Sequence, residues 1–188
     1  MTSRQTTYLS LGLIITVLVI AAVVTYRVIT NERVSESAAG QAFFGGEGSA
    51  DRFIATDGTT VDVGTYVGKS KLYINTWASW SPLSRDELIA LNEVASEYKD
   101  KSVTFIALNR QEPKEMAERY LATLPPLDNL VVVIDSDDYF YSQVGGYAMP
   151  ETLLYGTDGN LWRHIRQPQT KDSIKTLLDE FLFEDTSN

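Results

Sequence analysis

The sequence contains no cysteine and a single histidine, His164, among its 188 residues. Without a thiol the chain can form no disulfide, present no thiolate nucleophile and build no cysteine-ligated zinc or iron–sulfur site. One histidine also excludes a histidine-rich metal centre. The lack of cysteine does not indicate a compartment, because a chain without thiols is unaffected by the redox state around it. We therefore expect no cofactor and no metal.

Basic residues are also scarce: 16 Lys and Arg stand against 25 Asp and Glu, which gives a net charge of −9. Nucleic acid and anionic lipid head groups repel such a chain, so we expect no nucleic-acid partner. Hydrophobic residues make up 44% of the sequence, which is enough for a packed core and excludes a fully disordered chain. The length fits one domain with appendages.

One long apolar run without a charge occupies residues 9–26. As a helix it would span roughly 27 Å, close to the ~30 Å hydrocarbon core of a bilayer. A cleaved signal peptide is the alternative, but its apolar region is about 7–15 residues long and a small-residue cleavage site follows it. Residues 25–28 (TYRV) are a poor cleavage site. We expect a single-pass membrane protein that contacts the lipid bilayer through residues 9–26, although Arg4 and Arg27 on its two sides leave the orientation undecided.

The chain divides into four predicted segments. They are a short N-terminal tail over residues 1–8, a transmembrane anchor over residues 9–26, a flexible tether over residues 27–50 and a folded domain over residues 51–185. The tether is predicted from small residues and glycines in SESAAGQAFFGGEGS, residues 35–49. Phe43 and Phe44 are candidates within it for a docking or membrane-proximal contact.

Continuous apolar strands alternate with amphipathic helices in the domain, which predicts a mixed sheet covered by helices on both faces. β-forming residues around Asp57-Gly58 predict a hairpin over residues 51–63. Ser81 and Pro82 predict a helix start, with serine as the N-cap and proline at the first helical position. The further expected elements are strands over 71–77, 103–108, 130–134, 151–155 and 160–165, and helices over 81–99, 113–124, 137–144 and 171–183.

The segment that carries the functional argument is WASWSPLS, residues 77–84, where a strand turns into a helix. With cysteine at Ser81 and Ser84 it would read WASWCPLC, which resembles the active-site turn of thioredoxin-fold proteins. The specific resemblance is to the membrane-anchored TlpA/ResA/DsbE type that serves cytochrome c maturation. Asn75 and the segment GYAMPET, residues 146–152, resemble further parts of that family in the same order.

This resemblance covers about residues 51–183 and implies a thioredoxin-like α/β fold. The expected architecture is a mixed sheet flanked by helices, with an N-terminal β-hairpin and a single N-terminal transmembrane helix. The resemblance also implies a cis bond at Met149-Pro150 and an extracytoplasmic domain. In the family, the turn and the cis-proline loop frame a groove that pairs with extended peptide. The implied contacts of a protein or extended peptide at this Ser81/Pro150 groove are Trp80, Pro82, Leu83, Met149, Pro150 and Glu151.

The redox chemistry of the family has no counterpart in these residues. In active members a helix N-terminus favours the thiolate of the first cysteine, which attacks a disulfide, and the second cysteine resolves the product. Ser81 and Ser84 stand at both degenerate redox positions, so we expect no catalytic residue for dithiol exchange. A serine nucleophile would need a general base. The resemblance places His164 on a strand away from the turn, as a surface histidine, and Asp86 and Glu87 are interpreted as partners of the helix dipole.

Three functions remain open from the sequence. The first is a membrane-tethered, redox-inactive thioredoxin-like domain that binds or positions a protein partner in envelope protein folding or cytochrome c assembly. The second is a thiol-disulfide oxidoreductase, the activity of the family, whose cysteines have been replaced by Ser81 and Ser84. The third is a purely structural module whose groove is vestigial.

Overall fold

The computed structural model describes residue 44 and residues 52–183. The expected tail (1–8) and anchor (9–26) lie outside these residues, as does the tether (27–50) apart from Phe44. Among the described residues no helix is both long enough and apolar enough to cross a membrane. The bilayer contact through residues 9–26 therefore stays a prediction.

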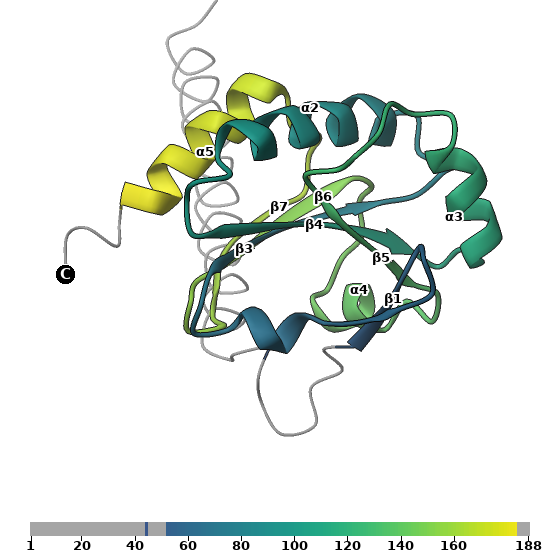
Figure 1. Ribbon diagram of the computed structural model, residues 1–188, viewed down its shortest axis with the longest axis horizontal. Helices are drawn as coiled ribbons and strands as arrows, with labels where there is room; N and C mark the ends of the chain where they lie inside the picture. The colour runs from purple at the N-terminus through teal and green to yellow at the C-terminus, as the bar shows by residue number, and fades with distance from the viewer. Residues whose placement is uncertain (1–43, 45–51, 184–188) are drawn as a thin grey trace, which may run out of the picture. The chain divides into compact units, whose positions relative to one another are not determined.

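Seven strands form one mixed sheet in the order β2-β1-β5-β4-β3-β6-β7 (Figure 1). The central strands β3, β4 and β5 are parallel, whereas β1, β2, β6 and β7 join by antiparallel pairing. This confirms the predicted mixed sheet with its N-terminal hairpin. The strands are β1 (Arg52–Ala55), β2 (Thr60–Asp62), β3 (Lys71–Trp77), β4 (Val103–Arg110), β5 (Val131–Asp135), β6 (Glu151–Tyr155) and β7 (Leu161–Ile165).

Helices cover both faces of the sheet, as the alternating pattern predicts. Helices α2, α3 and α5 lie on one face, and α4 with the short 3-10 helix η1 lies on the other (Figure 1). Their bounds are η1 (Val63–Tyr66), α2 (Ser84–Glu97), α3 (Lys114–Leu121), α4 (Tyr139–Gln143) and α5 (Lys171–Phe183). Lys171 and Lys175 of α5 pair with Glu97 of α2, so that these two helices lie side by side.

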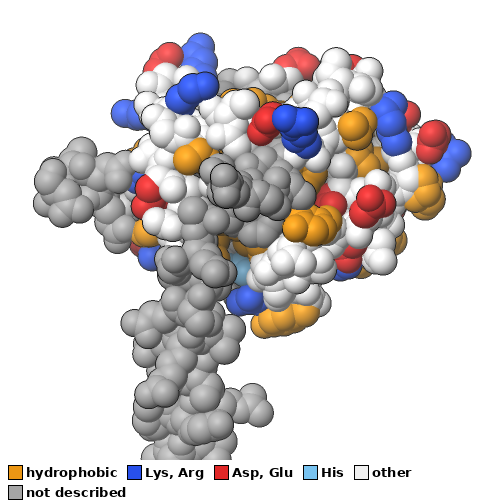
Figure 2. Space-filling model, turned by 90° about the horizontal axis from the view of Figure 1, so that it is seen from below, with side chains coloured by type: hydrophobic (Ala, Val, Ile, Leu, Met, Phe, Trp, Pro, Cys, Tyr) orange, Lys and Arg blue, Asp and Glu red, His pale blue; other side chains and the backbone are white. Residues whose placement is uncertain are grey.

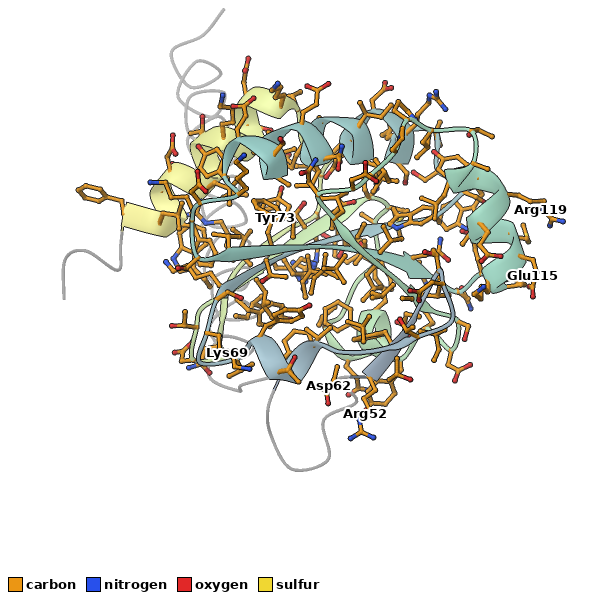
Figure 3. All side chains as sticks on the ribbon, viewed as in Figure 1. Arg52, Asp62, Lys69, Tyr73, Glu115 and Arg119 are labelled. Atoms are coloured by element: carbon orange, nitrogen blue, oxygen red, sulfur yellow. The ribbon has the colours of Figure 1, made fainter. Side chains whose placement is uncertain are left out.

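Alternation along β3 divides the core into two parts, because successive side chains of a strand point to opposite faces. Tyr73 and Trp77 belong to the cluster under α2 and α5, and Figure 3 shows Tyr73 pointing from the sheet toward these helices. Leu72 and Ile74 belong to the cluster on the α4 side. Asn75 shares the face of Tyr73 and Trp77, which places its polar side chain beneath α2.

The expected start of α2 at Ser81 is wrong. Two turns come first, closed by Ser81 N donating to Ala78 O at 3.1 Å and Ser84 N donating to Ser81 O at 3.2 Å. The helix itself begins at Ser84, and its N-cap position, Leu83, provides no side-chain cap. The physical reason is that the Ser81 hydroxyl faces another loop, where it donates to the carbonyl of Met149, and not the free amides of the helix.

The hydrophobic core extends upstream of residue 51, where the domain was expected to begin. Phe44 is only 1% exposed and belongs to the cluster on the α4 side. Its ring stacks on Phe140 at a centroid distance of 5.7 Å and meets Tyr155 edge-on at 4.9 Å. Phe44, predicted as a docking contact within the tether, is therefore a core residue of the domain.

Replacing Phe44 with alanine is expected to lower the free energy of unfolding by about 3–5 kcal/mol, because it empties a fully buried aromatic site. Phe183→Ala is the matched control, since Phe183 is 72% exposed and its loss is expected to cost less than about 0.5 kcal/mol. Urea unfolding of the full chain, followed by far-UV circular dichroism, measures both. Equal effects of the two substitutions would contradict the inclusion of Phe44 in the core.

Candidate functional site

The turn over residues 77–84 and the loop over residues 146–150 meet at the ends of β3 and β6. The Met149-Pro150 bond is cis, which confirms the expectation from the family resemblance. Ser81 Oγ donates to the Met149 carbonyl at 3.3 Å and joins the turn to the loop directly. Just before the turn, Thr76 Oγ1 donates to the backbone carbonyl of Glu151 and accepts from its amide, each at 3.2 Å.

Both serines at the degenerate redox positions are buried. Ser81 is 2% exposed and Ser84 is fully buried, with its Oγ accepting from Ala78 N at 3.4 Å. In the part of the chain that the structure describes, neither hydroxyl has a hydrogen bond to a carboxylate or to His164. A serine nucleophile requires such a base, so the geometry provides no activated nucleophile at the turn.

The rim of the turn is apolar and open to solvent. Trp80 is 60% exposed and Leu83 is 49% exposed, whereas Trp77 is fully buried in the core. Across the loop, Tyr147 is 79% exposed. Sequence reasoning missed Tyr147, although an aromatic residue two positions before the loop's Met149 was a visible signal. We call Trp80, Pro82, Leu83, Tyr147 and Met149 the turn surface.

Two of the predicted peptide contacts do not contribute exposed side chains to this surface. Pro150 is buried and Glu151 has no exposed side-chain area. The Glu151 carboxylate points into the fold, where Oε2 lies 2.5 Å from His164 Nε2. Its Oε1 accepts from the backbone amides of Tyr147 at 2.8 Å and of Ala148 at 2.5 Å. Glu151 thus holds the loop in place from behind.

The pair of Glu151 and His164 corrects a further expectation. His164 lies on β7, as the resemblance implies, but its side chain is only 4% exposed and does not form a surface site. Burial raises the pKa of Glu151, but the hydrogen bonds from His164, Ala148 and Tyr147 outweigh it, and the pKa lies below its ordinary value. The carboxylate is therefore ionised at neutral pH.

A second buried carboxylate, Glu87, lies in the first turn of α2 and is 2% exposed. Its Oε1 accepts from Asn75 Nδ2 at 2.7 Å and Oε2 from Gln169 N at 2.9 Å. Burial raises the pKa of Glu87 to about 7 despite these hydrogen bonds. Glu87 lies in the first turn of α2, as interpreted, but it is buried and has partners in Asn75 and Gln169, whereas its neighbour Asp86 is exposed.

The titration of Glu87 makes the fold more stable in mild acid. Because its pKa rises from an ordinary value of 4.5 to about 7 on folding, the folded chain keeps a proton that the unfolded chain releases. The retained proton contributes about 3 kcal/mol to the free energy of unfolding. This contribution is fully present below pH 4.5 and is lost as the pH rises to 7. Glu87→Gln is expected to remove that slope in urea unfolding at pH 5 and pH 8, whereas the exposed Asp86→Asn keeps it. An unchanged slope in Glu87→Gln would contradict the assignment.

A third buried carboxylate, Glu112, supports the turn from the end of β4. It is 3% exposed, and its Oε2 accepts from Ser79 N at 2.8 Å and from Asn109 Nδ2 at 2.7 Å. The Ser79 hydroxyl donates to the other carboxylate oxygen. A single glutamate after a strand gives no signal in the sequence, so this support was not predicted. Among residues 44 and 52–183 no three metal-ligating side chains of the His, Cys, Asp or Glu type lie together.

Parallel central strands, a cis-proline loop joined to a strand-to-helix turn, and serines at both turn positions define a thioredoxin-fold domain without a redox pair. Residues 38–178 match the model of the Redoxin family. The chain belongs to the Redoxin family.

Curated relatives are similar over most of the chain. Thiol-disulfide oxidoreductase ResA of Geobacillus kaustophilus is 28% identical over 168 residues, which cover 86% of this chain and 90% of the relative. ResA of Bacillus thuringiensis subsp. konkukian is 27% identical over 135 residues, which cover 69% and 74%. A DsbE-type thiol:disulfide interchange protein of Chlorobium tepidum has a TM-score of 0.62 at 22% identity, over 70% of this chain and 92% of its own. The last of these likenesses shows the fold alone.

Proposed function

We propose that this protein is a membrane-tethered, redox-inactive thioredoxin-like domain that binds or positions a protein partner at the turn surface. The context that we propose is envelope protein folding or cytochrome c assembly, with the domain outside the cytoplasm and residues 9–26 in the bilayer. One observation carries the proposal: both hydroxyls at the redox positions are buried inside the fold, while the side chains around them are apolar and exposed.

The lack of thiols argues against the activity for which the relatives are named. Exchange of a disulfide requires one sulfur to attack and a second to release the mixed disulfide. Ser81 and Ser84 can supply neither sulfur, and no cysteine exists elsewhere in the chain. A chain that keeps the cis-proline loop and three buried carboxylates around such a turn retains the supports of a binding groove without its reaction.

The composition of the turn surface favours polypeptide as the partner. Trp80 and Tyr147 are large, rigid rings with a polar tip, the kind of residue that dominates the energetics of protein interfaces. Leu83 and Met149 add apolar area beside them. An extended segment can place alternate side chains against these residues while its backbone pairs with the loop. The acidity of the chain favours a neutral or basic segment at this groove.

Trp80→Asp is expected to weaken partner capture by about thirtyfold, which corresponds to a hot-spot loss of about 2 kcal/mol. Crosslinking of the full chain in its native membranes, with quantitative mass spectrometry of the adducts, measures this. The matched control is Phe183→Asp, because Phe183 is similarly exposed but lies at the opposite end of β3, where Lys71 donates to Phe181 O. Capture that is equal in wild type and Trp80→Asp would contradict the proposal.

A further inference from the structure

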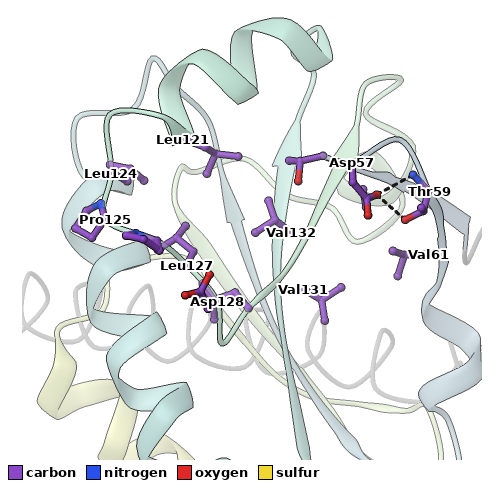
Figure 4. A pocket seen from close by; sticks show the side chains of 14 residues that line it. Asp57, Thr59, Val61, Leu121, Leu124, Pro125, Leu127, Asp128, Val131 and Val132 are labelled. Carbon is purple, nitrogen blue, oxygen red and sulfur yellow. Dashed lines mark hydrogen bonds between the residues drawn. The ribbon is translucent and has the colours of Figure 1, made fainter.

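A separate open groove of about 570 Å³ lies between the β1–β2 hairpin and the segment that joins α3 to β5 (Figure 4). Its lining includes no residue of the turn over 77–84 or of the loop over 146–150. Its volume falls within the range of sites that bind ligands or side chains of a partner. The proposed function of the turn surface makes no use of this groove.

The floor of the groove is apolar. Leu121, Leu124 and Val132, which pack on the side of the Tyr73 and Trp77 cluster, form it, and all three are half-buried. Val131, the preceding residue of β5, lines the groove from the opposite face of the sheet. Figure 4 shows Leu121, Val131 and Val132 between the two walls, with Leu124 on the loop side. These branched apolar side chains keep part of their surface in water. A partner that covers this surface makes binding more favourable by about 25 cal/mol for each Å² of apolar area that it buries.

One carboxylate stands on each wall. Asp57 belongs to the hairpin, and its Oδ1 accepts from Thr59 N at 2.8 Å and from Thr59 Oγ1 at 2.6 Å, which fixes its orientation. These hydrogen bonds hold the pKa of Asp57 below its ordinary value. Asp128 belongs to the opposite wall and is exposed. The charge of Lys114 also lowers the pKa of Asp57, and Lys114 is itself paired with Glu118 at 2.5 Å.

We propose that this groove docks a basic polypeptide segment, whose Lys or Arg side chains lay their aliphatic stems on the floor and direct their charged ends to Asp57 and Asp128. Lysine and arginine combine an apolar stem with a charged head, which is the combination that an apolar floor with acidic walls complements. A second copy of this chain is disfavoured because two molecules of charge −9 repel each other. The open form of the groove admits a continuous backbone.

On the face shown in Figure 2, acidic and basic side chains are interspersed and the hydrophobic ones lie in separate patches. The groove between the hairpin and the α3–β5 segment brings apolar side chains and the carboxylates of Asp57 and Asp128 into one lining.

The test titrates the full chain with the capped peptide KVKLKVK and with its acidic counterpart EVELEVE by isothermal calorimetry. We expect the basic peptide to bind and the acidic peptide not to bind. Asp57→Asn with Asp128→Asn is expected to weaken binding about tenfold, since each exposed ion pair contributes up to about 1 kcal/mol. The amide in Asp57→Asn can still accept from Thr59, so the hairpin is retained. Asp100→Asn with Asp172→Asn is the control of equal charge change and is expected to bind as wild type does.

Four outcomes would overturn the proposal. If the basic peptide does not bind at millimolar concentration, the groove is not a binding site. If both double variants weaken binding equally, the peptide responds only to the net charge of the chain and not to Asp57 and Asp128. Binding that Trp80→Asp abolishes and the Asp57/Asp128 variant leaves intact would assign the peptide to the turn surface, in support of the proposed function alone. Concentration-dependent dimerisation that Leu124→Ser removes would assign the groove to a second copy of the chain.

Discussion

Introducing cysteine at both redox positions, as Ser81→Cys with Ser84→Cys, is expected to convert an inert chain into a thiol-disulfide oxidoreductase. The wild-type chain should reduce insulin disulfides no faster than dithiothreitol alone, because it has no sulfur to exchange. The double variant should exceed that background by at least about tenfold. Position 81 lies beside the cis-proline loop, and the two positions share one turn, in which Ser84 N donates to Ser81 O at 3.2 Å.

The single variant Ser81→Cys separates this result from mere addition of a thiol. One cysteine can form a mixed disulfide but has no partner to resolve it, so it should show no turnover above background. Mass spectrometry should find a loss of two hydrogens on oxidation of the double variant only. Acceleration by the wild-type chain would contradict the account of the serines, and an inactive double variant with its disulfide formed would contradict the retained scaffold.

Glu151→Ala is expected to cause the second large effect, a loss of about 3–5 kcal/mol from the free energy of unfolding. The substitution leaves buried His164 without its carboxylate and frees the amides of Tyr147 and Ala148. Because the loop that carries Met149 then loses its support, partner capture should fall as well. Urea unfolding at pH 7 and the crosslinking assay measure the two effects.

The exposed pair of Glu180 and Arg163 provides the control for Glu151→Ala. Its members are about half exposed, so Glu180→Ala should cost no more than about 1 kcal/mol. The pH dependence of the free energy of unfolding provides a second check on Glu151. Because the pKa of Glu151 is lowered on folding, its contribution is present above pH 4.5 and is lost as the pH falls further. A Glu151→Ala variant as stable as wild type at pH 7 would contradict the buried pair.

Elements with a strong local pattern were predictable from the sequence. The bounds of β3, β6 and α5 agree with the expected ranges 71–77, 151–155 and 171–183, because apolar periodicity and flanking turn residues mark both ends. The cis bond at Met149-Pro150 followed from the family resemblance and from no local signal.

The buried carboxylates were not predictable, because their burial depends on partners far away in the chain. Gln169 is 82 residues from Glu87, and Glu112 meets the turn 33 residues upstream at Ser79. A glutamate in a first helical turn resembles an ordinary dipole partner until the covering segment is known. The burial of Phe44 in the core was not predicted either, because the glycine-rich stretch around it is typical of a tether.

The central claim, a redox-inactive domain that binds a protein partner through the turn surface, is tested most directly by placing a photo-crosslinking amino acid at position 80. We expect irradiation of cells that carry this full-length variant to give discrete protein adducts at position 80 and none at the control position 183. Adducts at position 80 should disappear when Leu83→Asp is added. No adduct at position 80, or the same adducts at both positions, would contradict the account.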